Sequence, residues 1–193
     1  SKEVKDYLKN IGVDYSNSKF LTNKGMSNYI SILDENNDLF TAISSMEVLE
    51  EINIDFISKI IDLIKSYKYI VMDTNLREDV LEFICKNCPN SKIIVDCVSR
   101  KKALKIKKLL RYIYLIKPNI YEAEELTEVP YNNQEDLEKI VKIFLDKGVK
   151  KVFISMGDEG IVYADKNENG IVKIEEELKI ENSSGCGDAA MSG

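Results

Sequence analysis

Histidine is missing from this chain of 193 residues. Without an imidazole, the chain cannot carry out Ser-His-Asp or Cys-His catalysis, nor any mechanism that uses a histidine general base. Zinc sites that mix cysteine and histidine are excluded for the same reason. Any acid–base chemistry must therefore fall to a carboxylate, a lysine, a tyrosine or a cysteine.

A long apolar run and a basic excess are missing as well. No apolar stretch is long enough to cross a bilayer, and the charged N-terminal residues lack the apolar segment of a signal peptide. The net charge of −6 argues against a general nucleic-acid binder, although an acidic protein can still bind an anionic nucleotide at a local site. We therefore expect a cytosolic protein whose partners include neither a membrane nor a nucleic acid.

Cysteine is scarce, with four residues in the chain. Cys85 and Cys88 form a CxxC pair, but no second pair follows at the spacing of a zinc site. Reduced thiols are the usual state in a cytosolic protein of this size. We interpret these residues as ordinary cysteines near a helix end, with a metal or redox role as the less favoured alternative.

The residues that are present predict one α/β domain. Hydrophobic residues make up 44% and charged residues 31%, an ordinary soluble balance. Asn28–Leu33 and residues 38–43 alternate around a polar turn, which is typical of an antiparallel hairpin, and Ser44 or Ser45 is expected to cap a short helix. Further on, short apolar strands alternate with helices, which predicts a mostly parallel sheet with covered faces. We expect strands at 69–72, 93–95, 112–116, 152–155, 161–164 and 171–180, and helices at 54–66, 78–86, 101–111, 119–127 and 137–147.

Three of the expected strands run into a polar residue. These residues are Asp73, Asp96 and Lys117. Each could simply cap the helix that follows it. Because ligands bind beyond the carboxyl ends of the strands in open α/β sheets, the three together favour a lined cleft.

The most informative segment is 182–190, which reads Asn-Ser-Ser-Gly-Cys-Gly-Asp-Ala-Ala. Two glycines around a small residue, just before an expected helix, allow the backbone to approach a ligand closely. Free N–H groups at such a helix start suit an anion, for example a phosphoryl group. Asp188 would lie in the first turn, where it either favours the helix dipole or acts as a base that takes a hydroxyl proton.

This segment resembles the C-terminal DTxGAGD signature of the PfkB-type carbohydrate kinases. The resemblance implies a ribokinase-like three-layer α/β/α fold, with Asp188 as the general base and the amides of Gly185, Cys186 and Gly187 as the anion hole. Two positions differ from the family: Asn182 replaces the usual Asp, and Cys186 replaces the usual Ala. Asn182 keeps an oxygen for a monovalent cation such as K⁺ but lacks the charge.

Two other stretches resemble the same family in the same order. Residues 117–123, Lys-Pro-Asn-Ile-Tyr-Glu-Ala, are similar to its NPNxxEA element, with Lys117 in place of the commoner Asn. The resemblance implies that Asn119 and Glu122 bind Mg²⁺ through water and the phosphates of ATP, although their spacing alone predicts an N-terminal capping box. Residues 155–160, which include Ser155, Gly157 and Gly160, resemble the family's strand–GxxG turn. The resemblance implies that this turn lies near the nucleotide, although GDEG alone is an ordinary turn.

Residues 96–107 resemble a DxVSxxKAxKIK pattern of pseudouridine kinases. They begin with Asp96-Cys97-Val98-Ser99 and continue with lysines at 102, 105 and 107. The hairpin and the Asp-Thr-Asn-Leu sequence at 73–76 resemble those kinases too. The resemblance points to the substrate, and we name Asp96, Ser99, Asn28 and Lys102 as candidates to bind it. The alternative for the lysines is a solvated basic helix face.

The sequence and these resemblances thus predict transfer of the γ-phosphoryl group of ATP to a ribose 5′-hydroxyl, with pseudouridine as the expected acceptor and pseudouridine 5′-phosphate as the product. Residues 17–44 would form a β lid that closes over the sugar and pairs two subunits. The alternatives are another PfkB-type kinase that acts on ribose, fructose or a nucleoside, and a non-catalytic sugar or nucleotide binder. A dinucleotide-binding domain is least favoured, because no GxGxxG follows an early strand. Family members are markedly longer, so we expect residues 1–193 to be part of a kinase domain.

Overall fold

The computed structural model describes residues 2–34, 39–173 and 185–193. Its main body is a six-stranded sheet whose strands are neighbours in sequence order, from β3 to β8. The strands from β3 to β6 are parallel, and β7 and β8 extend the sheet as antiparallel strands. The six strands are β3 (Tyr69–Asp73), β4 (Lys92–Asp96), β5 (Ile113–Lys117), β6 (Lys151–Ser155), β7 (Ile161–Asp165) and β8 (Asn169–Val172).

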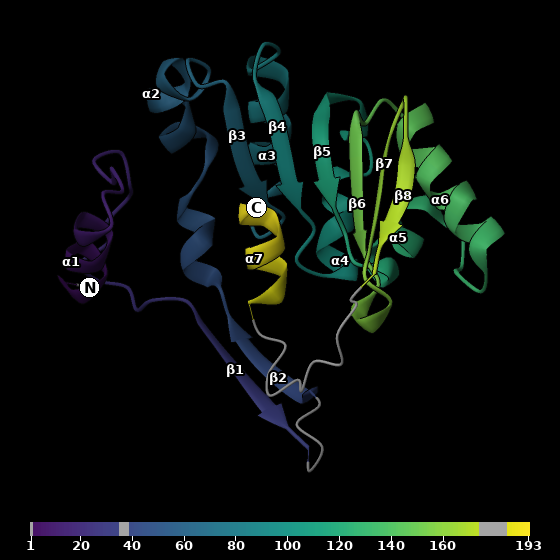
Figure 1. Ribbon diagram of the computed structural model, residues 1–193. Coiled ribbons are helices and arrows are strands. Elements are labelled where there is room, and N and C mark those ends of the chain that lie inside the picture. The colour runs from purple at the N-terminus through teal and green to yellow at the C-terminus, as the bar shows by residue number, and fades with distance from the viewer. Residues whose placement is uncertain (1, 35–38, 174–184) are drawn as a thin grey trace.

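The helices that connect the parallel strands cover one face of this sheet (Figure 1). Right-handed crossovers between strands in sequence order place all of these helices on the same side. Aliphatic and aromatic side chains such as Leu81, Ile116, Ile140 and Phe144 are buried in this core. The connecting helices are α3 (Glu78–Asn87), α4 (Arg100–Ala103), α5 (Ile120–Thr127) and α6 (Gln134–Asp146), with short 3₁₀ turns at η2 (Leu104–Ile106) and η3 (Leu110–Tyr112). Before β3, η1 (Glu47–Glu51) leads into α2 (Ile54–Ile64), which packs against α3, and η4 (Gly157–Glu159) follows β6.

The last helix, α7 (Cys186–Ser192), lies on the opposite face of the sheet, in front of β3 and β4 in Figure 1. Its position is tied to β5 by a close approach, since a Cβ added to Gly187 would lie 3.4 Å from Lys117 Nζ. The fold therefore has helices on both faces of a mostly parallel sheet, which confirms the predicted fold class.

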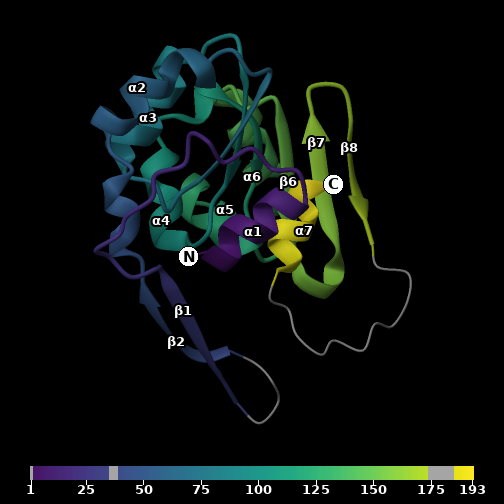
Figure 2. The same ribbon diagram turned by 90° about the vertical axis from the view of Figure 1, so that its left-hand side faces the viewer.

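A separate two-stranded sheet projects away from this body, as both ribbon views show (Figures 1 and 2). It consists of β1 (Asn28–Leu33) and β2 (Leu39–Ser45), which pair antiparallel with Ile30 opposite Ile43. Both isoleucine side chains are more than half exposed. An N-terminal helix, α1 (Lys2–Asn10), precedes the hairpin. Within the described part of the chain, no helix combines the length and apolar character required to cross a membrane.

Most expected elements are present, and two expectations were wrong. Ser44 and Ser45 belong to β2 and cap no helix; the residue at the start of η1 is Met46, and the Ser45 hydroxyl donates to Glu47 instead. The expected helix over 101–111 is broken into α4, η2 and η3. Both α and 3₁₀ turns place residues three apart on the same face, so the apolar spacing cannot tell them apart. Of the strand expected over 171–180, β8 ends at Val172 and residues 174–180 lie outside the described residues.

Candidate active site

The three polar residues at the strand ends form a single row. The parallel register places Asp73 beside Asp96, and Asp96 beside Lys117. The preceding residues Met72 and Val95 are buried on the helix-covered side, so the row faces the side where α7 lies. The three residues therefore lie side by side at the carboxyl edge, and the cleft that they were expected to line stays a prediction.

Lys117 is the most buried charged group of this row. It is only 7% exposed, and its Nζ lies 3.8 Å from Asp96 Oδ2. A buried ammonium is costly to desolvate, and one carboxylate at this distance offsets only part of that cost. The arrangement leaves a positive charge in place beside α7, where an anionic ligand would complete its pairing.

The glycine-rich segment meets Lys117 at this point. Gly185 precedes α7 with a left-handed φ of 83°, and a Cβ there would meet no atom within 4 Å. A Cβ at Gly187 would approach the Lys117 ammonium, at 3.4 Å. Cys186 and Asp188 are exposed. The structure thus brings together two motifs that are far apart in the chain, and it leaves open space at the glycines.

The segment after β5 is held by a capping box. Asn119 Oδ1 accepts from the Glu122 N–H at 2.9 Å, and Glu122 Oε2 accepts from the Asn119 N–H at 2.8 Å. Burial raises the pKa of the Glu122 carboxyl, and the nearby Asp96 charge adds to the rise, whereas the Asn119 hydrogen bond and Lys117 oppose it. The predicted capping box is confirmed, and it fixes both side chains at the carboxyl edge next to Lys117.

The turn after β6 joins this edge from the other side. The Ser155 N–H donates to Pro118 O at 3.0 Å, and Ser155 pairs with Asn119 in an isolated parallel bridge. Gly157 and Gly160 both have left-handed backbones, with φ of 64° and 102°. A Cβ on Gly160 would lie 2.1 Å from the carbonyl oxygen of Val172, so this turn packs directly on β8.

The substrate candidates fall into two groups. Asp96 belongs to the row, and Ser99 begins α4 by accepting from the Lys102 N–H at 3.4 Å. Lys102 Nζ donates to Asn75 Oδ1 at 2.5 Å. Asn28 lies apart from these three: among the residues that the structure describes, no hydrogen bond or ion pair joins it to any of them.

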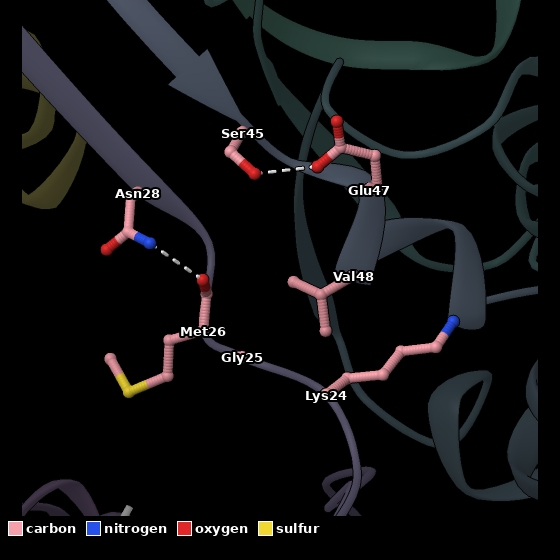
Figure 3. Close-up of a pocket in the computed structure, with 7 residues that line it drawn as sticks. All are labelled: Lys24, Gly25, Met26, Asn28, Ser45, Glu47 and Val48. Carbon is pink, nitrogen blue, oxygen red and sulfur yellow. Dashed lines mark hydrogen bonds between the residues drawn. The ribbon is translucent and has the colours of Figure 1, made fainter.

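Asn28 instead lines a pocket of about 360 Å³ between the start of β1, the end of β2 and η1 (Figure 3). Its amide donates to Met26 O at 3.2 Å, and Ser45 donates to Glu47 Oε2 at 2.7 Å. Lys24 extends along the same pocket. The hairpin therefore contributes polar groups at its base, where it joins the body. Asn182, the residue expected beside a monovalent cation, lies outside the described residues.

From the sequence, neither Thr74 nor Asn75 was named as a site residue, and Lys105 was included only as a member of the lysine pattern. Thr74 is fully buried, its hydroxyl donates to Cys97 O, and its N–H donates to Asp96 O at 3.1 Å. Lys105 donates to the carbonyls of the turn after β3. The available signal was the polar sequence that directly follows Asp73, because residues that follow a strand lie at the same edge of the sheet as the row.

The sequence pattern of the pfkB family of carbohydrate kinases matches residues 1–193. The chain belongs to this family. Pfk-B kinases use ATP and act on small molecules, and the family consists of phosphotransferases.

Pseudouridine kinase of Escherichia coli (strain K12) is 30% identical to the chain over 182 residues, which cover 94% of the chain and 58% of that protein. A crystal structure of a sugar kinase homologue from Clostridium perfringens has a TM-score of 0.82 at 34% identity, and it is matched over 97% of the chain and 59% of that structure. Ribokinase from Thermotoga maritima shares the fold, with a TM-score of 0.71 at 16% identity, over 100% of the chain and 64% of that structure. The chain therefore spans about three-fifths of the length of these relatives.

Proposed function

We propose that this chain forms the phosphoryl-transfer part of an ATP-dependent kinase that phosphorylates the 5′-hydroxyl of a ribose, with pseudouridine as the acceptor. The observation that carries the proposal is the close approach of Gly187 to the buried Lys117 at the carboxyl edge of the sheet. It joins the glycine-rich segment, the capping box and the row of charged residues into one site. Family membership supports the reaction class, and the 30% identity to a pseudouridine kinase supports the acceptor.

The residues around Lys117 fit an anionic phosphoryl group. The ammonium is buried with one carboxylate 3.8 Å away, and Gly185 leaves open space where a side chain would otherwise stand. In the proposed reaction, Lys117 and the N–H groups of Gly185, Cys186 and Gly187 stabilise the oxygens of the transferring group. Asp188, exposed in the first turn of α7, accepts the proton of the attacking hydroxyl. Positioning and electrostatics supply most of the acceleration in such reactions.

Mg²⁺ fits this site through water more readily than through direct ligands. The described residues contain no cluster of three or more acidic, cysteine or histidine side chains that could hold a metal. Asn119 Oδ1 and Glu122 Oε2 are engaged in the capping box, which leaves the second carboxylate oxygen of Glu122 for a water ligand. When bound, the ion would offset the charge of the phosphates. A K⁺ ion beside Asn182 belongs to the proposal as well, although that residue lies outside the described ones.

The nucleotide would extend from Lys117 toward Ser155, Gly157 and Gly160, which line the neighbouring strand end. The acceptor would lie at the other end, near Asp96, Ser99 and Lys102. The hairpin within residues 17–44 would close over it as a lid, with Asn28 contributing from the hairpin base. The exposed Ile30 and Ile43 on one face of the hairpin support a further proposal, that two subunits pair through their lids.

An assay of ADP release by the whole protein, with ATP and Mg²⁺, tests this proposal. We expect turnover of pseudouridine in preference to uridine, ribose and fructose. Asp188→Asn should reduce turnover at least about a hundredfold, the low end for loss of a general base. Asp146→Asn, on the far helix α6 where Asp146 pairs with Lys142, is the matched control and should leave turnover unchanged.

The outcomes separate the alternatives. Turnover of ribose, fructose or another nucleoside would retain the mechanism and replace the acceptor. Ligand-induced stabilisation without ADP formation would favour a non-catalytic binder. Full turnover in Asp188→Asn would refute the assignment of the base.

A further inference from the structure

The turn that follows β3 carries more internal bonds than its role as a connection requires. Asp73 Oδ1 accepts from the Asn75 N–H, and Asp73 Oδ2 accepts from the Asn75 amide, both at 2.9 Å. The Asn75 side chain and the Asp73 carboxylate are therefore locked face to face. Two carbonyl groups of the same turn, those of Thr74 and Leu76, take no part in this pairing and accept from another side chain.

Those two carbonyls are bound by one lysine. Lys105 Nζ donates to Thr74 O at 2.9 Å and to Leu76 O at 2.8 Å. The side chain is half-buried, and carboxylates of the described residues act on it only through their charge, without a hydrogen bond. Burial and the neighbouring Lys102 lower the pKa of Lys105 and outweigh the charges of Glu50, Asp73 and Glu78, which raise it, so the ammonium is held there at a cost. A lysine on a solvated helix face would keep its ammonium in water.

A second lysine completes the arrangement. Lys102 Nζ donates to Asn75 Oδ1 at 2.5 Å, which orients the Asn75 amide so that its NH₂ group meets Asp73. On the other side, Thr74 bonds to the end of β4 through both its hydroxyl and its N–H. The turn is thus held from two directions by the strand end of β4 and by the segment that follows it.

The position of this turn along the row gives it a role in the proposed reaction. Asp73 and Lys117 lie two strands apart, about 10 Å at ordinary strand spacing. Since the phosphoryl group belongs at Lys117, the locked Asp73–Asn75 pair lies at the distance that the far end of a nucleoside would reach. A fixed carboxylate and amide there are suited to hydrogen bonds with sugar or base polar groups.

We infer that Lys105, assisted by Lys102, is a positioning residue that holds the Asp73–Asn75 pair in place to bind the acceptor. Lys105 itself does not touch the acceptor; it acts through the backbone of the turn. Lys102 likewise reaches the acceptor end through Asn75. This inference rests on the proposed kinase function and adds residues that set acceptor affinity.

The test uses the whole protein and measures KM for pseudouridine, KM for ATP and kcat separately. Lys105→Met removes the ammonium and keeps the stem; we expect KM for the acceptor to rise about tenfold or more, with KM for ATP within about twofold. Lys105→Arg keeps donors for both carbonyls and should restore part of the loss. Lys101→Met is the matched control, because Lys101 is an exposed lysine of the same segment, and it should change neither constant.

Asn75→Ala provides a second route should Lys105→Met fold poorly. Asn75 is only half-buried, so its truncation leaves the core intact. We expect it to raise acceptor KM by a similar factor, and adding Lys102→Met to it should produce little further change, because both act on the same amide. Unchanged acceptor KM in Lys105→Met and in Asn75→Ala, with an active wild type, would overturn the inference and leave the kinase function standing.

A failure of the proposed kinase function can be distinguished from a failure of the inference about Lys105. If the wild type turns over no acceptor, hydrogen exchange of the Asn75 and Leu76 amides still reports on the lysine. Faster exchange at these amides in Lys105→Met, but not in Lys101→Met, would support the positioning of the turn by Lys105. Equal exchange in both variants would overturn it.

Discussion

Replacing Gly160 with alanine tests how firmly the turn after β6 is bound to β8. The new Cβ would lie 2.1 Å from Val172 O and 3.0 Å from the Cα of Lys173, both backbone atoms. Such contacts cannot be relieved by turning a side chain, so either the turn or the end of β8 must move. The left-handed φ of 102° adds strain for any residue with a Cβ.

The two costs can be estimated separately. Backbone strain at a position that only glycine tolerates is about 1–3 kcal/mol. Moving β8 weakens hydrogen bonds to β7, each worth about 1 kcal/mol. We therefore expect Gly160→Ala to lower the free energy of unfolding by about 3 kcal/mol or more.

Gly157→Ala is the matched control. Gly157 lies three residues earlier in the same turn with φ of 64°, and a Cβ there meets no atom within 4 Å. Only the left-handed backbone is penalised, which costs about 1 kcal/mol. Urea unfolding followed by circular dichroism measures both variants against the wild type. Equal losses in the two would refute the reasoning, because the close contacts with Val172 and Lys173 are met at Gly160 and not at Gly157.

Two further predictions concern buried groups. Thr74→Val removes the hydroxyl that donates to Cys97 O and should lower the free energy of unfolding by about 1–2 kcal/mol. The Thr127 hydroxyl donates to a carbonyl within its own helix, so Thr127→Val should lower it by less than about 0.5 kcal/mol. Equal losses of unfolding free energy, measured by urea unfolding, would contradict this. Iodoacetamide should modify Cys186 rapidly in the native protein and the buried Cys85 only after unfolding. Because burial raises the pKa of Cys85 to about 12, labelling of Cys85 should remain slow as the pH is raised to about 10. Mass spectrometry of timed samples measures this labelling, and early modification of Cys85 would contradict the prediction.

Much of this architecture follows from local chemistry in the sequence. The alternation of short apolar strands and helices predicts the parallel sheet, and the side-chain period predicts which residues face the helices. The capping box is equally local, because Asn119 and Glu122 bond to each other's backbone within one helical turn. The row of Asp73, Asp96 and Lys117 follows because parallel strands end at a common edge.

The remaining features depend on contacts between distant segments. Nothing local to Lys105 distinguishes an ammonium bound to two carbonyls from one in solvent, since the partners lie about thirty residues away in the turn after β3. The approach of Gly187 to Lys117 is likewise a tertiary contact. At Ser45, a local signal gave the wrong prediction. The sequence favours a helix cap there, but Ser45 pairs with Asn28 across the hairpin and extends the strand instead.

The sequence order of the parallel strands has a consequence for how the site is assembled. In a doubly wound sheet, the reversal of strand order opens a crevice between helices that diverge to both faces. Here β3 to β6 run in order without a reversal, and their helices all lie on one face. On the open face, α7 is the segment that approaches Lys117 within the described part of the chain. A ligand bound between them would contact both the sheet edge and α7, the last helix of the chain. Ligand binding and the docking of α7 on the sheet would therefore be thermodynamically linked.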